Sequence, residues 1–103
     1  MREVRYSKSF NDQLIELIDF GEQMYGVELA EAKKRLVYET IERMLARHLR
    51  VKRPHNVLEL TINPISKTPF IVLYDFDDDE LRLHFIFHRN ADLCDLDPAS
   101  VEW

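Results

Sequence analysis

The most regular pattern in the chain is an alternation of apolar and polar positions in its last third. One set of alternate positions is apolar: Leu81, Leu83, Phe85 and Phe87. The other set carries Arg82, His84, Ile86 and His88. Because successive side chains of a strand point to opposite faces, this pattern predicts a strand with one face on a core and the other open to solvent.

The segment before this strand predicts its hairpin partner. Residues 70–75 form a run of β-branched and aromatic side chains, which is typical of a strand. Residues 76–80 then hold four carboxylates and suit a solvated turn. The two runs therefore predict a hairpin with an acidic turn. That turn lacks the spacing and the glycine of a calcium loop, so no metal site is predicted in it.

Two longer segments have helical spacing. The first runs from the hydroxyls of residues 7–9, which offer N-caps, to about Met24, and Gly26 ends it. Ser9 followed by Asp12 resembles a capping box. Its apolar face is Phe10, Leu14, Leu17, Ile18 and Gly21. The second helix is predicted over residues 28–49, with a stripe of Leu29, Leu36, Val37, Ile41, Met44, Leu45 and His48. The short connection predicts an antiparallel helical hairpin.

Two further strands complete the predicted fold. Residues 2–6 alternate so that Val4 and Tyr6 point inward, and residues 57–62 place Leu58, Leu60 and Ile62 on one face before an Asn63-Pro64 turn. The order β-α-α-β-β-β predicts a two-layer α+β fold, with the helical hairpin packed on a mostly antiparallel sheet. The helices are expected to cover the face of Leu81, Leu83, Phe85 and Phe87. The tail is expected to be extended or 3₁₀-like, with Leu93, Leu96, Val101 and Trp103 able to pack onto the body.

Length and composition indicate a single domain, residues 1–103. No segment is long and apolar enough for a membrane span, and the N-terminus lacks the apolar region of a signal peptide, so a cytoplasmic protein is expected. The lone Cys94 excludes an internal disulfide and a paired-cysteine metal motif, and it is interpreted as a reduced structural or surface thiol. No metal or cofactor is predicted.

The net charge of −5 is unevenly distributed. Residues 43–55 hold five Lys/Arg, two His and no carboxylate, so this segment carries about +5 and the remainder about −10. Its cations Arg47, Arg50, Lys52 and Arg53 suit a surface that binds phosphates or carboxylates. The competing interpretation is a solvated helix C-terminus, where cations suit the helix dipole. An acidic protein segment is as plausible a partner as nucleic acid.

The two histidines of the last strand are the other candidates for chemistry. His84 and His88 lie four residues apart on one predicted face, about 13 Å between Cα atoms, which is too far for both to ligate one zinc ion. We interpret His84 as a surface residue. His88 lies at the strand end beside Arg89, where it can serve as an acid, a base or a phosphate donor, with binding or structure favoured over catalysis.

The whole pattern resembles the RelE/ParE superfamily, the toxins of bacterial type II toxin–antitoxin (TA) systems, also called plasmid stabilisation proteins. The resemblance spans nearly the whole chain. Its sharpest part is residues 68–92, where a strand ending in Tyr74 precedes an acidic turn, an apolar strand, and then His88 and Asp92. It implies growth inhibition, a cognate antitoxin, and one of two activities. RelE-like members cut mRNA on the ribosome, whereas ParE-like members inhibit DNA gyrase.

The residues favour the ParE-like activity. RNA cleavage needs a base, an acid and cations around the phosphate, and RelE-like toxins often have an Arg at the start of the third strand. Here that strand begins Pro69-Phe70-Ile71, and the acidic C-terminal segment ends in Trp103. A ribosome-dependent mRNA endonuclease, with His88 or His84 as acid or base and Arg82 and Arg89 as phosphate clamps, is the alternative. A non-toxic binding module is a third interpretation.

The resemblance and the charge pattern together nominate binding residues. The antitoxin is expected to use apolar surface between the helical hairpin and the sheet. Its carboxylates are expected to meet the basic segment 47–53. The candidate residues for antitoxin or target binding are Arg47, Arg50, Lys52, Arg53, Lys67 and Tyr74.

Overall fold

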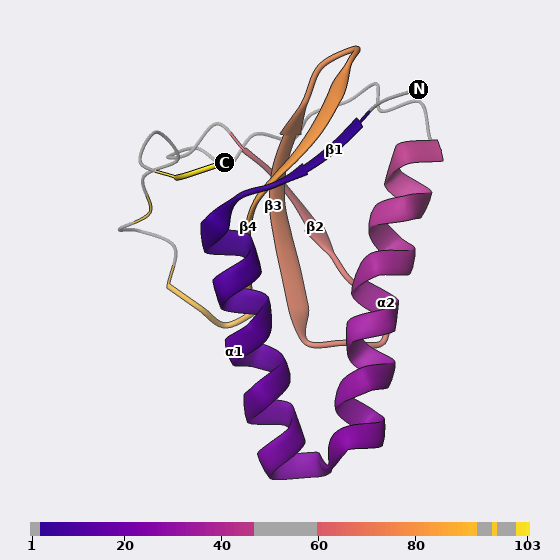
Figure 1. Ribbon diagram of the computed structural model, residues 1–103, viewed down its shortest axis with the longest axis vertical. Coiled ribbons are helices and arrows are strands. Elements are labelled where there is room, and N and C mark those ends of the chain that lie inside the picture. The colour runs from indigo at the N-terminus through magenta and orange to yellow at the C-terminus, as the bar shows by residue number, and fades with distance from the viewer. Residues whose placement is uncertain (1–2, 47–59, 93–95, 97–100) are drawn as a thin grey trace.

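The computed structural model describes residues 3–46, 60–92, 96 and 101–103. Its elements are β1 (Glu3–Tyr6), α1 (Lys8–Tyr25), α2 (Val27–Ala46), β2 (Thr61–Pro64), β3 (Phe70–Phe76) and β4 (Glu80–His88). The order β-α-α-β-β-β and the α+β class are therefore confirmed. Figure 1 shows the helical hairpin against the sheet, with the turn between the helices extending past the end of the strands.

The sheet is mixed and has the order β1-β4-β3-β2. β2, β3 and β4 form the expected antiparallel meander. β1 instead joins the edge of β4 in parallel, with Val4 opposite Leu81 and Tyr6 opposite Leu83. A parallel pair needs a crossover connection, and the helical hairpin is part of it.

The helix ends follow from local chemistry. Ser7, rather than Ser9, is the N-cap of α1, because its hydroxyl oxygen accepts the backbone N–H of Phe10 at 2.9 Å. Gly26 ends the helix at φ 94°, a conformation that other residues rarely adopt. Leu29, predicted on the buried stripe of α2, is 47% exposed, and Ala30 is buried in its place. Leu29 lies in the first turn of α2, next to the connection between the two helices.

A β-bulge at His84 divides β4 into two parts. Tyr74 pairs with Leu83 and the next residue back, Leu73, pairs with Phe85, so His84 is the extra residue. Because side-chain direction alternates with period two, one extra residue moves the rest of the strand to the opposite face. Leu81, Leu83 and Ile86 therefore pack in the helix-side core.

The predicted single floor of Leu81, Leu83, Phe85 and Phe87 is therefore wrong in its second half. Phe85 and Phe87 lie in a second cluster on the other face of the sheet, with Leu60 and Leu73. The expectation that His84 and His88 share a face fails for the same reason. His88 pairs with Phe70, a member of the helix-side core, whereas His84 hydrogen-bonds Asp75, which pairs with Arg82.

Ser7 and the first turns of α1 hydrogen-bond the backbone of β4 on both sides of the bulge. The Ser7 hydroxyl donates to the His84 carbonyl at 2.5 Å, and the Ser7 N–H donates to the Leu83 carbonyl at 3.0 Å. The N–H of Ile86 donates to the Gln13 side-chain oxygen at 3.0 Å. Buried backbone groups are costly when unpaired, so these contacts stabilise the bulge and position α1 over the sheet.

The turn expected at Asn63-Pro64 is also corrected, because both residues belong to β2. β2 is an edge strand, and proline is tolerated there since its missing N–H need not face a neighbour. The chain turns between Ile65 and Phe70, whose N–H and carbonyl are joined at 3.0 Å. Lys67 adopts φ 66° within this turn.

The far face of the sheet, opposite the helices, is covered in part by the C-terminal segment. Leu96 and Val101 pack against the second cluster, as predicted for these residues. The N–H of Lys8 donates to the Glu102 carbonyl at 2.7 Å, which ties this segment to the start of α1. Leu93 lies outside the described residues. The polar face of β4 is therefore less open than the alternation of its residues suggested.

Candidate functional site

Arg82, a predicted phosphate clamp, is held by three carboxylates of the β3–β4 hairpin. Its Nε and one terminal nitrogen bind both oxygens of Asp75, at 2.9 and 3.1 Å. The other terminal nitrogen reaches Asp77 at 2.9 Å and Glu80 at 3.1 Å. All three guanidinium nitrogens are engaged, so the charge of Arg82 is neutralised within the protein.

The protonation equilibria of this cluster follow from those contacts. Burial raises the pKa of Asp75, but hydrogen bonds from His84 and Arg82 outweigh it and hold that pKa well below its usual range. The hydrogen bond from Arg82, with those from the N–H groups of Asp79 and Glu80, lowers the pKa of Asp77 to about 2. The carboxylates raise the pKa of Arg82. Asp75, Asp77 and Arg82 are therefore charged at neutral pH.

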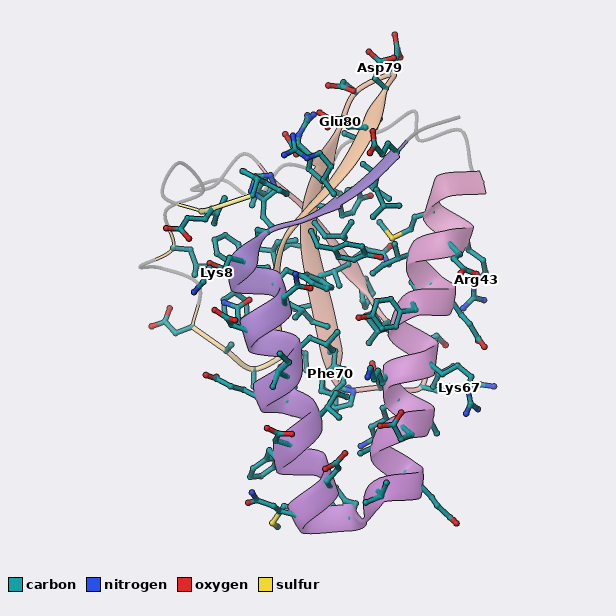
Figure 2. The ribbon with its side chains drawn as sticks, in the orientation of Figure 1. Lys8, Arg43, Lys67, Phe70, Asp79 and Glu80 are labelled. Atoms are coloured by element: carbon teal, nitrogen blue, oxygen red, sulfur yellow. The ribbon has the colours of Figure 1, made fainter. Side chains whose placement is uncertain are left out.

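The acidic turn has a structural role. One oxygen of Asp77 accepts the N–H groups of Asp79 and Glu80, both at 2.8 Å, which fixes the turn. Figure 2 shows Asp79 and Glu80 at the tip of this hairpin, remote from Phe70. The Arg82 guanidinium occupies the centre on which the neighbouring carboxylates converge. Within the described ranges no group of three or more His, Cys, Asp or Glu side chains could hold a metal ion.

His84, interpreted from the sequence as a surface residue, is instead 7% exposed. Its Nε2 lies 2.9 Å from Asp75, and its ring meets the edge of Trp103 at 4.7 Å between centroids. The Arg5 guanidinium lies 5.7 Å from the centre of the same indole. Among the described residues the His84 Nδ1 has no hydrogen-bond partner. The far face therefore holds a closed Asp75–His84–Arg82 network rather than an open catalytic surface.

A different site lies at the opposite end of the sheet, where the helical hairpin meets the start of β3. We call it the hairpin–sheet pocket. Its volume is about 120 Å³. Its apolar wall includes Leu17, Ile18, Phe20, Tyr25, Ala30 and Phe70. Figure 2 shows Phe70 between the two helices. Phe20 and Tyr25 are more than half exposed, so the apolar surface continues outward from the pocket.

Lys33 and His88 are the polar groups that line this pocket. The Lys33 Nζ lies 5.0 Å from the centre of the Tyr25 ring, a cation–π contact that positions the ammonium at the pocket. Of the residues that line the pocket, none carries a carboxylate. The pocket therefore suits an apolar anchor with a negative charge beside it.

The hydrogen bond of His88 decides what its imidazole can do. Its Nδ1 accepts the N–H of Asn90 at 3.2 Å, so a neutral His88 carries its proton on Nε2. A nitrogen that already carries a proton cannot act as a base. In this tautomer the Nε2–H of His88, a residue that lines the pocket, can donate a hydrogen bond. Arg89 beside it is exposed.

The other predicted binding residues are dispersed or lie outside the described residues. Lys67 is exposed in the turn between β2 and β3. Tyr74 is 5% exposed and packs beside Phe76 in the helix-side core, so little of its side chain is open to a partner. Arg47, Arg50, Lys52 and Arg53 lie outside the described residues, and their role stays a prediction.

Sequence reasoning missed the hairpin tip. Phe20, Met24, Tyr25 and Val27 are each 59–60% exposed around the turn between the helices. The sequence did contain a signal for this surface, because these apolar residues lie outside the predicted buried faces of α1 and α2. Lys33 had no signal of its own, because its role depends on Tyr25 and on the sheet. Neither described helix combines the length and apolar composition needed to cross a membrane.

Comparisons with known proteins identify the fold. No family model matches the chain, and neither does any curated protein. A solved structure does match: a chain of the chromosomal ParDE TA system from P. aeruginosa, with a TM-score of 0.75 and 16% sequence identity. The match covers 85% of this chain and 96% of that one. The chain therefore has the fold found in that system.

Proposed function

We propose that this protein, which has a ParE/RelE-type fold, is a cytoplasmic toxin of a type II TA system that inhibits DNA gyrase and is neutralised by a cognate antitoxin. The solved structure similar to this chain belongs to a ParDE TA system. The observation that favours a ParE-like activity over mRNA cleavage is the closed network around Arg82. The hairpin–sheet pocket, by contrast, is open and suited to binding.

RNA cleavage through a 2′-hydroxyl requires a base, an acid and cations that face the phosphate. Two of the four candidates for these roles are engaged internally. Arg82 is neutralised by three carboxylates, and His84 is buried between Asp75 and Trp103. His88 is positioned as a donor rather than a base. These contacts support a toxin that acts by binding a protein target.

The expected result is inhibition of gyrase supercoiling by the purified protein at micromolar concentration. The assay monitors relaxed plasmid with gyrase and ATP, and topoisomerase I serves as the control enzyme. Full supercoiling at these concentrations would overturn the proposal. The double variant H88A/R89A tests the endonuclease alternative. If wild type cleaves mRNA on ribosomes and H88A/R89A does not, the protein is RelE-like. Expression without growth arrest would indicate a non-toxic binding module.

Charge reversal at Lys33 is expected to weaken antitoxin binding about tenfold, because the hairpin–sheet pocket then repels an acidic partner segment. The measurement is isothermal titration of the protein encoded by the neighbouring reading frame into the Lys33→Glu variant. Lys34→Glu is the matched control: it makes the same charge change one residue away, and Lys34 does not line this pocket. Equal losses in the two variants would mean that net charge, rather than the pocket, governs binding.

A further inference from the structure

A second cavity lies between the helices and has the opposite charge. This interhelical groove is lined by residues of α1 and α2 alone and has a volume of about 290 Å³. Its apolar surface comprises Leu14, Ile15, Ile18 and Tyr38. Leu14 and Ile18 are buried in the core, whereas Ile15 is 59% exposed and Tyr38 is 36% exposed. The groove therefore has a fixed apolar floor with exposed apolar walls.

Carboxylates flank this groove on both helices. Asp19 and Glu22 line it from α1, and Glu31 and Lys34 line it from α2. None of the three carboxylates forms an ion pair with another described residue. The groove therefore carries a net charge of about −2 from these side chains, whereas the hairpin–sheet pocket has Lys33 and His88. The charged side chains that line the two surfaces therefore differ in sign.

We infer that the interhelical groove docks an amphipathic helix whose narrow apolar strip is flanked by Lys or Arg. The lining residues on α1 run from Asn11 to Glu22, a length of about 16 Å, which matches about three helical turns. A third helix in the groove between two antiparallel helices buries its apolar strip on both. Cations on its flanks then reach Asp19 and Glu22 on one side and Glu31 on the other.

This inference does not depend on gyrase inhibition or on an antitoxin. It follows from charge complementarity at a groove built from the two helices. It also differs from docking at the hairpin–sheet pocket, which takes an acidic partner.

Two labelled, helix-stabilised peptides of about 14 residues test the inference, each with Leu and Ile on one strip and either Lys or Glu on its flanks. Fluorescence anisotropy with the full-length chain should show the Lys peptide binding about tenfold tighter than the Glu peptide. This preference should fall as salt rises, because exposed charges are screened. Equal affinity of the two peptides would overturn the proposal.

Variants locate the binding site. The double variant E22K/E31K should abolish the preference for the Lys peptide. Glu16→Lys, a control on α1 that does not line the groove, should preserve it. Ile15→Gln should weaken binding about tenfold, while Val27→Gln at the hairpin turn should leave it unchanged. Equal effects of E22K/E31K and Glu16→Lys would place the peptide elsewhere. A concentration-dependent dimer that is lost in Ile15→Gln would instead assign the groove to a second copy of the chain.

The test separates this inference from the proposed toxin function. It reads peptide binding and uses neither gyrase nor growth arrest. Lys34→Glu should strengthen Lys-peptide binding, because it adds a fourth carboxylate to the groove, while Lys33→Glu should leave that binding unchanged. If the protein does not inhibit supercoiling, the expected peptide-binding results are unchanged.

Discussion

Replacing Ile86 by Ala is expected to lower the free energy of unfolding by about 3 kcal/mol, the usual cost of removing a fully buried isoleucine side chain. Ile86 is 0% exposed and packs in the helix-side core. Strict alternation along β4 would place it with Arg82 on the other face of the sheet. The size of the loss therefore tests whether Ile86 is buried, as the bulge at His84 requires.

Chemical denaturation of the Ile86→Ala variant provides the measurement, with Ile15→Ala as the matched control. Ile15 is 59% exposed in α1, so the same truncation there should change stability by no more than about 0.5 kcal/mol. The backbone bond from Ile86 to Gln13 survives the change, because the N–H makes it. Similar losses at the two isoleucines would show that Ile86 is not buried and that the bulge is absent.

Replacing Arg82 by Met is expected to cost about 2 to 3 kcal/mol at neutral pH, because it leaves the carboxylates of Asp75, Asp77 and Glu80 close together without their cation. The side chain of Arg82 is 22% exposed, and that of Asp77 is 53% exposed, so solvent screening keeps the cost below that of a fully buried pair. Met has an unbranched apolar side chain similar to the methylene stem of Arg82. The substitution therefore removes the positive charge and keeps most of the packing of the stem.

The pH dependence of this loss has a definite sign. In the folded protein the pKa of Asp75 lies below its unfolded value of about 3.9. The stability it contributes is therefore present above about pH 4 and is lost as pH falls toward the folded pKa. The difference in the free energy of unfolding between wild type and Arg82→Met should therefore become smaller as pH falls through this interval.

Urea denaturation between about pH 7 and pH 2 measures this difference. Arg35→Met, on an exposed position of α2, is the control and should show a small loss at every pH. A loss for Arg82→Met that stays constant below about pH 4 would contradict the role assigned to the carboxylates.

The helical hairpin, rather than the sheet, offers the surface that is open to partners. The polar face of β4 first suggested an active site, but its charges are satisfied within the protein. The exposed apolar residues of the hairpin, by contrast, face solvent beside pockets of opposite charge. They lie there because α1 and α2 extend past the strands, so the sheet cannot cover their ends. The hairpin is therefore the part of the molecule best suited to protein partners.

Local pattern was enough to predict both helices and the order of the elements, although the strand predicted over residues 57–62 shares only residues 61 and 62 with β2. Apolar spacing at one helical face predicted α1, and Gly26 marked its end, because both signals depend on residues close in sequence. The β3–β4 hairpin was predicted for the same reason. The edge position of β2 was not predicted. Asn63-Pro64 was therefore interpreted as a turn, whereas both residues belong to this edge strand.

The sequence by itself determined the α+β class, the element order and the residues that must be buried somewhere. Only the tertiary structure decided which face of β4 each residue takes. The backbone around the bulge at His84 is hydrogen-bonded by Ser7 and Gln13, which lie more than 70 residues away in the chain. The alternation of apolar and polar residues does not reveal that a strand contains one extra residue. The same shift placed His84 beside Asp75 and left His88 at the hairpin–sheet pocket. Contacts between distant segments, rather than local propensity, therefore separated the closed network from the open pocket.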